Sequence, residues 1–140
     1  MLCVLAPLVF MGCGESREAP AVALSKGEFV KQATSICEKR GAEKDTAVQQ
    51  GLAQLNGSTP STHDLEGLAD LAIPAYRKMA DELAELRPPV SDTRAVDAFL
   101  RRLQTAVKTI EKSPARLVHG EPFTSANGAA KAYGLDGCTL

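Results

Sequence analysis

The chain has no tryptophan, and its only aromatic residues are four phenylalanines and two tyrosines among 140 residues. Proteins that bind single-stranded nucleic acids offer exposed aromatic rings on which bases stack. A formal net charge of −1 also leaves no excess of basic groups for neutralising phosphates. We therefore expect no nucleic-acid partner.

The short motifs of common catalytic sites are also missing. The sequence has no Gly-X-Ser-X-Gly, no glycine-rich phosphate loop, and neither His-Glu-X-X-His nor Cys-X-X-Cys-His. Ser61, His63 and Asp64 are close in sequence, and such a local cluster is typical of helix capping. Catalytic groups more often converge from different elements. We expect no enzymatic activity and no cofactor.

His63 and His119 are the only two histidines, and each lies near the end of an expected helix. We expect both side chains to face solvent or to cap helices, and we expect no metal site. The alternative function is a metal-handling protein or weak enzyme in which His63 or His119 meets nearby carboxylates in the folded chain.

Residues 1–12, MLCVLAPLVFMG, form an apolar run that is too short to cross a bilayer as a helix. Its length suits the apolar core of an export signal. The segment from Phe10 to Gly14, FMGCG, resembles a bacterial lipoprotein signal, which implies cleavage before Cys13 and attachment of lipid to Cys13. Phe10 and Met11 depart from the Leu and the small residue that are usual there, and no Lys or Arg precedes the run.

A true start codon upstream of Met1 would explain these departures. Two alternatives to lipid attachment stay open: an unmodified signal peptide, and a start that is simply misread. If Cys13 carries acyl chains such as palmitate, the membrane becomes a partner through that lipid. Residues 13–24 then form a flexible tether, because they are polar and contain Pro20 without helical periodicity. Residues 25–140 remain as the folded domain.

Apolar residues in 25–140 recur at helical spacing, and no useful stretch alternates as a strand does. The expected helices are 25–55 with Ser25 as cap, one from Ser61 or Thr62 to Pro88 with a kink at Pro74, 91–112 capped by Ser91, a short turn after Ser113-Pro114, and 124–133. This pattern predicts an all-α fold: a small antiparallel helical bundle of three long helices and a short C-terminal helix.

The four cysteines are expected to have three different roles. Cys3 leaves with the signal and Cys13 is the proposed lipid site, so Cys37 and Cys138 remain as an even pair in an exported chain. We expect them to form a structural disulfide. A redox pair or a thiolate metal site are the alternatives, but redox cysteines are normally close in sequence, as in Cys-X-X-Cys.

Three groups of residues carry a resemblance to a known family. They are Phe29, Ala33 and Ile36-Cys37; Leu86-Arg87-Pro88-Pro89; and Ala132-Tyr133-Gly134-Leu135 with Cys138. Together they resemble a group of small lipoproteins of unassigned function from high-GC Gram-positive bacteria. The resemblance implies export, helices and a cysteine pair, with the domain facing outward at the cell envelope, and it brings no activity.

The function that fits these expectations is a non-catalytic binding or interaction module, held at the cell membrane by its lipid. Such a module would recognise an envelope protein or a small ligand through a groove between helices. The sequence does not identify that ligand or partner.

Overall fold

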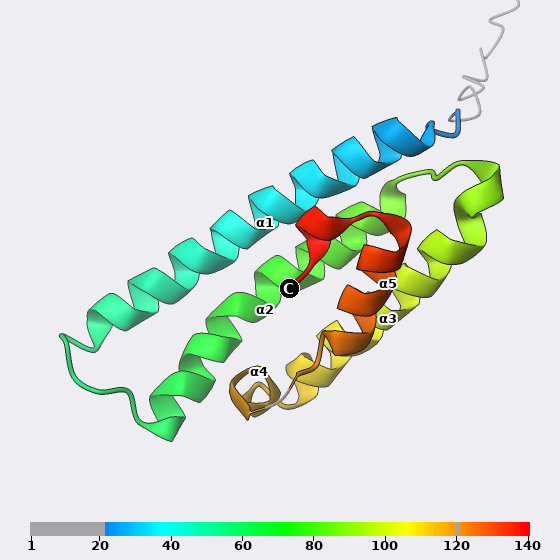
Figure 1. Cartoon of the computed structure of the whole chain (residues 1–140). Helices are drawn as coiled ribbons and strands as arrows, with labels where there is room; N and C mark the ends of the chain where they lie inside the picture. Colours follow the sequence, from blue (N-terminus) through cyan, green and yellow to red (C-terminus); the bar gives the residue numbers. More distant parts are fainter. Residues whose placement is uncertain (1–21, 120) are drawn as a thin grey trace, which may run out of the picture.

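The structure is a computed structural model of the whole chain, and it describes residues 22–119 and 121–140. The helices are α1 (Lys26–Gln54), α2 (Thr62–Glu85), α3 (Thr93–Lys112), α4 (Ala115–His119) and α5 (Thr124–Tyr133), with the 3₁₀ turns Val90–Asp92 and Asp136–Cys138. The described residues contain no strand. Figure 1 shows α1 running antiparallel along α2, with α3 and α5 on the other side of α2. The expected all-α antiparallel bundle is confirmed.

Helix α1 begins where its capping residues predict. The Ser25 hydroxyl accepts a hydrogen bond from the Glu28 N–H at 3.3 Å, and the Ser25 N–H donates to the Glu28 carboxylate at 3.0 Å. The helix ends before Asn56 and Gly57, which have φ values of 50° and 78°. Both residue types tolerate this left-handed geometry, so the chain can reverse there.

Helix α2 is capped by Ser61, the first of the two residues that the sequence offered for that position. The helix continues through Pro74, whose side chain is exposed. Proline leaves the carbonyl of the previous turn without a donor, and a position facing solvent lets water satisfy that carbonyl. The structure thus places Pro74 on the outer side of the bundle.

The third helix starts one residue later than expected, because the residue at its cap position is Asp92 and not Ser91. The helix begins at Thr93 with Asp92 at the cap position, and Val90–Asp92 forms a separate 3₁₀ turn. The Asp92 N–H donates to the Pro89 carbonyl at 2.9 Å, so Ser91 is held inside that tight turn and caps nothing. The sequence pattern could not show this, because both residues are common capping types.

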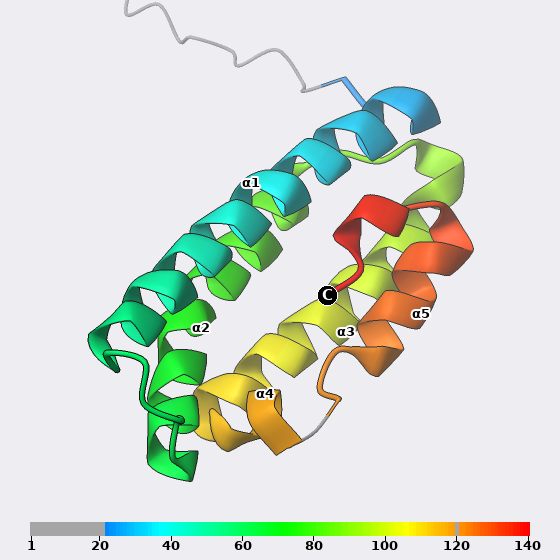
Figure 2. The ribbon, with the colours of Figure 1, turned by 60° about the vertical axis from the view of Figure 1, so that its left-hand side comes forward.

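Helix α5 has the predicted bounds. Gly134 follows it with φ of 93°, and the Leu135 N–H donates to the Ala130 carbonyl at 2.9 Å. This left-handed cap turns the chain back, and Leu135 becomes fully buried. The reversal directs the last residues, 135–140, across the bundle towards α1; we call this segment the tail. Figures 1 and 2 show the tail crossing from α5 to α1.

The core lies where α1, α2, α3 and α5 face one another. Its largest fully buried side chains are Phe29, Met79, Leu83, Val96, Phe99, Leu103, Ile110 and Leu135. All of these except Leu135, which belongs to the tail, come from the apolar faces of helices, and burial of such faces is the main force that stabilises a helical bundle. No helix in the described part of the chain is both long and apolar enough to cross a membrane.

Candidate functional site

A groove of about 590 Å³ lies between α2, α4 and α5. Pockets that hold small molecules typically measure about 300–1,000 Å³. The described residues that line the groove are Tyr76, Leu117, Glu121, Pro122, Phe123, Thr124, Asn127, Gly128, Lys131 and Leu140. They come from four separate parts of the chain, so only the folded bundle assembles them. Figure 2 shows α4 beside α2 and α3, where the chain leads into α5.

Two aromatic rings form the apolar part of this groove. The ring centroids of Tyr76 on α2 and Phe123 before α5 are 4.7 Å apart, with the ring planes inclined by 38°. Both residues are buried. Burial raises the pKa of Tyr76, an effect that the charge of Lys44 partly opposes. The Tyr76 hydroxyl forms no hydrogen bond with any described residue, so it can serve a bound molecule as donor or acceptor.

Polar groups also line the groove, on Tyr76, Glu121, Thr124, Asn127 and Lys131. The Thr124 hydroxyl donates to the Glu121 carboxylate at 3.1 Å, and Lys131 forms no ion pair with the described residues. The described lining contains neither His nor Cys. A nucleophile beside a base, or several convergent carboxylates, would indicate catalysis. An aromatic and aliphatic lining with one cation and one anion is instead typical of a binding site.

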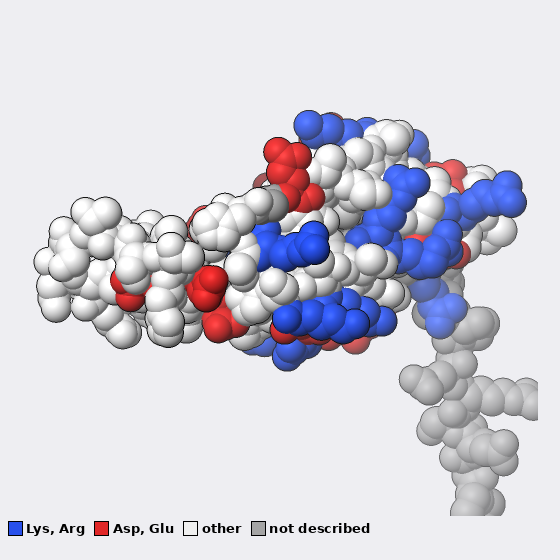
Figure 3. Space-filling model, turned by 90° about the horizontal axis from the view of Figure 1, so that it is seen from below, with Lys and Arg blue, Asp and Glu red and all other residues white. Residues whose placement is uncertain are grey.

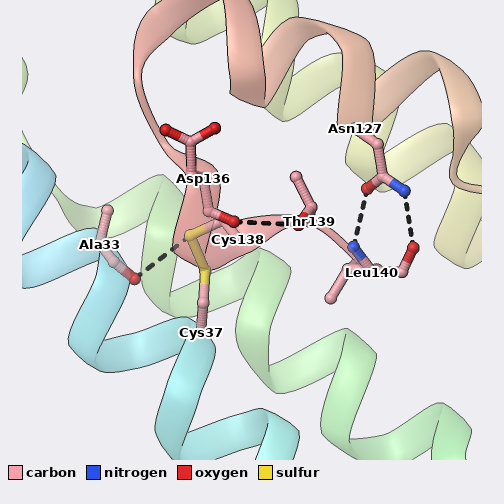
Figure 4. Close-up of a disulfide and its surroundings, with 7 residues drawn as sticks. All are labelled: Ala33, Cys37, Asn127, Asp136, Cys138, Thr139 and Leu140. Atoms are coloured by element: carbon pink, nitrogen blue, oxygen red, sulfur yellow. Dashed lines mark hydrogen bonds between the residues drawn. A yellow bond between two sulfur atoms is a disulfide. The ribbon is translucent and has the colours of Figure 1, made fainter.

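The tail forms one edge of the groove, and a disulfide holds it. The sulfurs of Cys37 on α1 and Cys138 in the tail are 2.00 Å apart, and the bond joins residues separated by 101 positions. The predicted disulfide is therefore confirmed. Figure 4 shows it beside α1, with Cys138 Sγ 3.4 Å from the Ala33 carbonyl oxygen.

Beyond Cys138 the tail is fixed again by α5. Asn127 Nδ2 donates to the Leu140 backbone oxygen at 2.6 Å, and the Leu140 N–H donates to Asn127 Oδ1 at 2.9 Å (Figure 4). Gly137 also approaches α1 closely, since a Cβ there would lie 2.7 Å from Thr34 Cγ2. Leu140, which lines the groove, is thus fixed by two kinds of bond. The disulfide holds the chain at Cys138, two residues earlier, and the Asn127 side-chain amide forms two hydrogen bonds with the Leu140 backbone.

A second group of interacting polar residues joins α1, α5 and the start of α3. The Tyr133 hydroxyl donates to Asp92 Oδ2 at 2.8 Å, and Lys26 Nζ lies 4.7 Å from the centre of the Tyr133 ring. Burial, followed by the bond to Asp92, raises the pKa of Tyr133 to about 12. The same bond holds the pKa of Asp92 below its usual value. These contacts fix α5 against the bundle and line none of the described pockets, so we assign them a structural role.

Arg40 is the one buried charged residue among those that the structure describes. Its guanidinium pairs with Glu43 on α1 and with Glu82 on α2. These hydrogen bonds raise the pKa of Arg40 and lower the pKa values of both glutamates. A buried arginine needs such partners to offset its lost hydration, so the cluster links α1 to α2.

His63 and His119 are both exposed, near the start of α2 and at the end of α4. No group of three or more His, Cys, Asp or Glu residues in the described part of the chain is placed to hold a metal ion. Ser61 and Asp64 form a capping box, as the sequence indicated. Cys13, the expected lipid site, lies outside the described residues.

Sequence reasoning missed most of the groove. Leu117, Phe123, Asn127 and Leu140 were not singled out by the sequence. Phe123 carried one signal: it is an apolar residue in a connection that should be polar, directly before a helix. Asn127 and Leu140 carried none, because their pairing depends on the path of the tail.

Comparisons with protein families, with curated proteins and with solved structures gave no match for this chain, so its function must be argued from its own residues.

Proposed function

We propose that this chain is an exported, lipid-anchored and non-catalytic binding module that takes an apolar molecule or side chain into the α2–α4–α5 groove. The observation that carries the binding role is the groove itself, with the Tyr76 and Phe123 rings in contact at 4.7 Å and aliphatic walls beside them. A groove of this volume with aromatic and aliphatic side chains in its wall can take a ligand that packs against them.

Export and anchoring rest on different observations. The apolar run 1–12, followed by Cys13, resembles a lipoprotein signal, and the pairing of Cys37 with Cys138 supports an oxidising compartment. Lipid on Cys13 would place the domain at the outer face of the membrane. Residues 14–21 would then connect the anchor to the first described residue, Val22.

The groove can be tested with Nile red, a neutral dye that fluoresces in apolar surroundings. The full chain should bind the dye saturably, and Leu117→Ser should weaken that binding severalfold, because it removes apolar wall from the groove. Leu71→Ser is the matched control, since Leu71 is 45% exposed on α2 and lies outside the groove. Equal dye binding by all three proteins would refute the proposed site.

The anchor can be tested by mass spectrometry of the protein isolated from native membranes. A mature chain that starts at Cys13 and carries acyl chains supports the proposal, and Cys13→Ser should release the protein from the membrane fraction. Measurement with and without reductant also reports the state of Cys37 and Cys138. An uncleaved chain without lipid would overturn the anchoring, while the dye experiment would still decide the groove.

A further inference from the structure

Charge is divided unevenly between the helices α1 and α2 and the later helices α3 to α5. Residues 93–135, which include α3, α4 and α5, contain seven Lys and Arg against three Asp and Glu. Residues 22–92, which include α1 and α2, contain eight against eleven. No Lys or Arg occurs from 45 to 76, and Figure 3 shows that end of the molecule with few charged side chains. The small net charge therefore conceals a basic region at α3 to α5.

A second hollow, of about 290 Å³, lies in this basic region between α3 and α5. Arg101 and Arg102 of α3 line it, together with Thr105, Pro122 and Ser125. Neither guanidinium forms a hydrogen bond or ion pair with a described residue. The described lining also contains no carboxylate. Two unpaired cations thus border one concave surface.

A neighbouring hollow, between α2 and α3, shows that this arrangement is not general on the surface. There Arg77 and Lys108 are accompanied by Asp81 and Glu111, and Arg77 Nε donates to Glu111 Oε1 at 2.7 Å. In the α3–α5 hollow no carboxylate of the described lining lies beside the two arginines. Asp97 is placed four residues before Arg101, at the spacing of a helical ion pair, yet no such pair forms.

We propose that the α3–α5 hollow binds a phosphate-bearing anion through Arg101 and Arg102, with the Ser125 hydroxyl as a further donor. A guanidinium presents its N–H groups as a planar fork that fits two oxygens of a phosphate. Ser125 is exposed in the first turn of α5, and its hydroxyl has no partner among the described residues. The site shares only Pro122 with the lining of the α2–α4–α5 groove, and it does not depend on lipid at Cys13.

The anion could belong to a membrane phospholipid or to a soluble phosphate compound, and both sources share this recognition chemistry. The two can be separated with the full chain carrying Cys13→Ser, which excludes a covalent anchor. One arm titrates inorganic phosphate and follows the Arg101, Arg102 and Ser125 resonances by nuclear magnetic resonance. The other arm compares binding to vesicles of phosphatidylglycerol with binding to vesicles of phosphatidylcholine.

Two variants remove the site in different ways. R101A/R102A should weaken anion binding about tenfold, because charge-assisted hydrogen bonds are lost. S125D places a negative charge in the hollow; it should abolish binding without loss of thermal stability, since an acidic residue in the first turn favours the helix dipole. The matched control is R94A/K112A, which removes the same charge from exposed positions of α3 outside the hollow.

Binding of phosphate that only the site variants lose supports the proposal with a soluble source. A preference for phosphatidylglycerol that only the site variants lose supports it with a phospholipid source. If R94A/K112A weakens binding as much as R101A/R102A, the effect is one of total charge and the proposal is wrong. It is equally wrong if neither probe binds.

Discussion

Asn127 and Leu140 exchange two hydrogen bonds, so that an asparagine side chain on α5 pairs with the backbone of the tail much as two strands pair. The Cys37–Cys138 disulfide lies two residues before Leu140. Because Leu140 and Asn127 both line the α2–α4–α5 groove, the bonds that close the fold also shape the candidate site. Changes that release the tail should therefore alter ligand binding as well as the fold.

Removal of the disulfide should destabilise the domain strongly. In the chain-entropy model, closing a loop of about 100 residues contributes about 4–5 kcal/mol. The double variant Cys37→Ser/Cys138→Ser should lose about that much free energy of unfolding, as measured by urea denaturation. Reductant should lower the urea concentration at which half of the wild-type chain is unfolded, and it should leave that concentration unchanged for the double variant. A loss below about 1 kcal/mol would contradict this assignment.

Asn127→Ala should release Leu140 while the disulfide stays intact. Asn127 is half-buried and forms its two bonds only with Leu140, so the helix itself should persist. We expect Nile red to bind the variant severalfold more weakly than the wild-type chain, with only a small loss of stability. Asn127→Asp keeps the acceptor but sets a carboxylate oxygen against the Leu140 backbone oxygen, so its dye binding should be no stronger than that of Asn127→Ala. Wild-type affinity in Asn127→Ala would show that the tail edge does not contribute to the groove.

The Tyr133–Asp92 hydrogen bond should make stability depend on pH at both ends of the scale. The pKa of Asp92 is lowered in the folded chain, so its contribution is full above the unfolded value of about 4 and is lost as pH falls through the folded pKa. The pKa of Tyr133 is raised to about 12, so its contribution is full below about 10 and is lost as pH rises towards 12.

Tyr133→Phe tests both effects in one experiment. Its free energy of unfolding should lie below that of the wild-type chain by a constant amount between about pH 5 and pH 9. The gap should narrow below about pH 4 and again above about pH 10. Tyr76→Phe is the control for the acidic side only, because the Tyr76 hydroxyl has no hydrogen-bond partner among the described residues, whereas burial raises the pKa of Tyr76 and gives it an alkaline pH dependence of its own. A gap that is independent of pH would rule out this linkage.

The Arg40–Glu82 pair should couple α1 to α2 energetically. A double-mutant cycle with Arg40→Ala and Glu82→Ala should show that the two losses of stability are not additive, because each change removes the same ion pair between the helices. Glu43 remains beside Arg40, so Glu82→Ala should cost less than Arg40→Ala. Additive losses would indicate that the pair contributes nothing to the contact between the helices.

Much of the fold was predictable because its signals are local. Ser25 with Glu28, Ser61 with Asp64, and Gly134 after Tyr133 each set a helix end by contacts within a few residues. The prediction that Ser91 caps α3 was wrong, because a residue type that is common at helix caps can also occupy a 3₁₀ turn. Prolines at 88 and 89 indicated that α2 must stop, but they did not show how many residues the chain needs before α3 begins.

The sequence by itself determined the helices, their buried faces and the two cysteines left to pair, because helical spacing, caps and residue counts are properties of the chain alone. Only the tertiary structure decided which surfaces are concave. The α2–α4–α5 groove requires Tyr76, Phe123 and Leu140 to meet, and the α3–α5 hollow requires Ser125 to approach Arg101 and Arg102. These contacts depend on the angle at which α5 packs and on the path of the tail. Packing between residues that are distant in sequence determines that angle and that path.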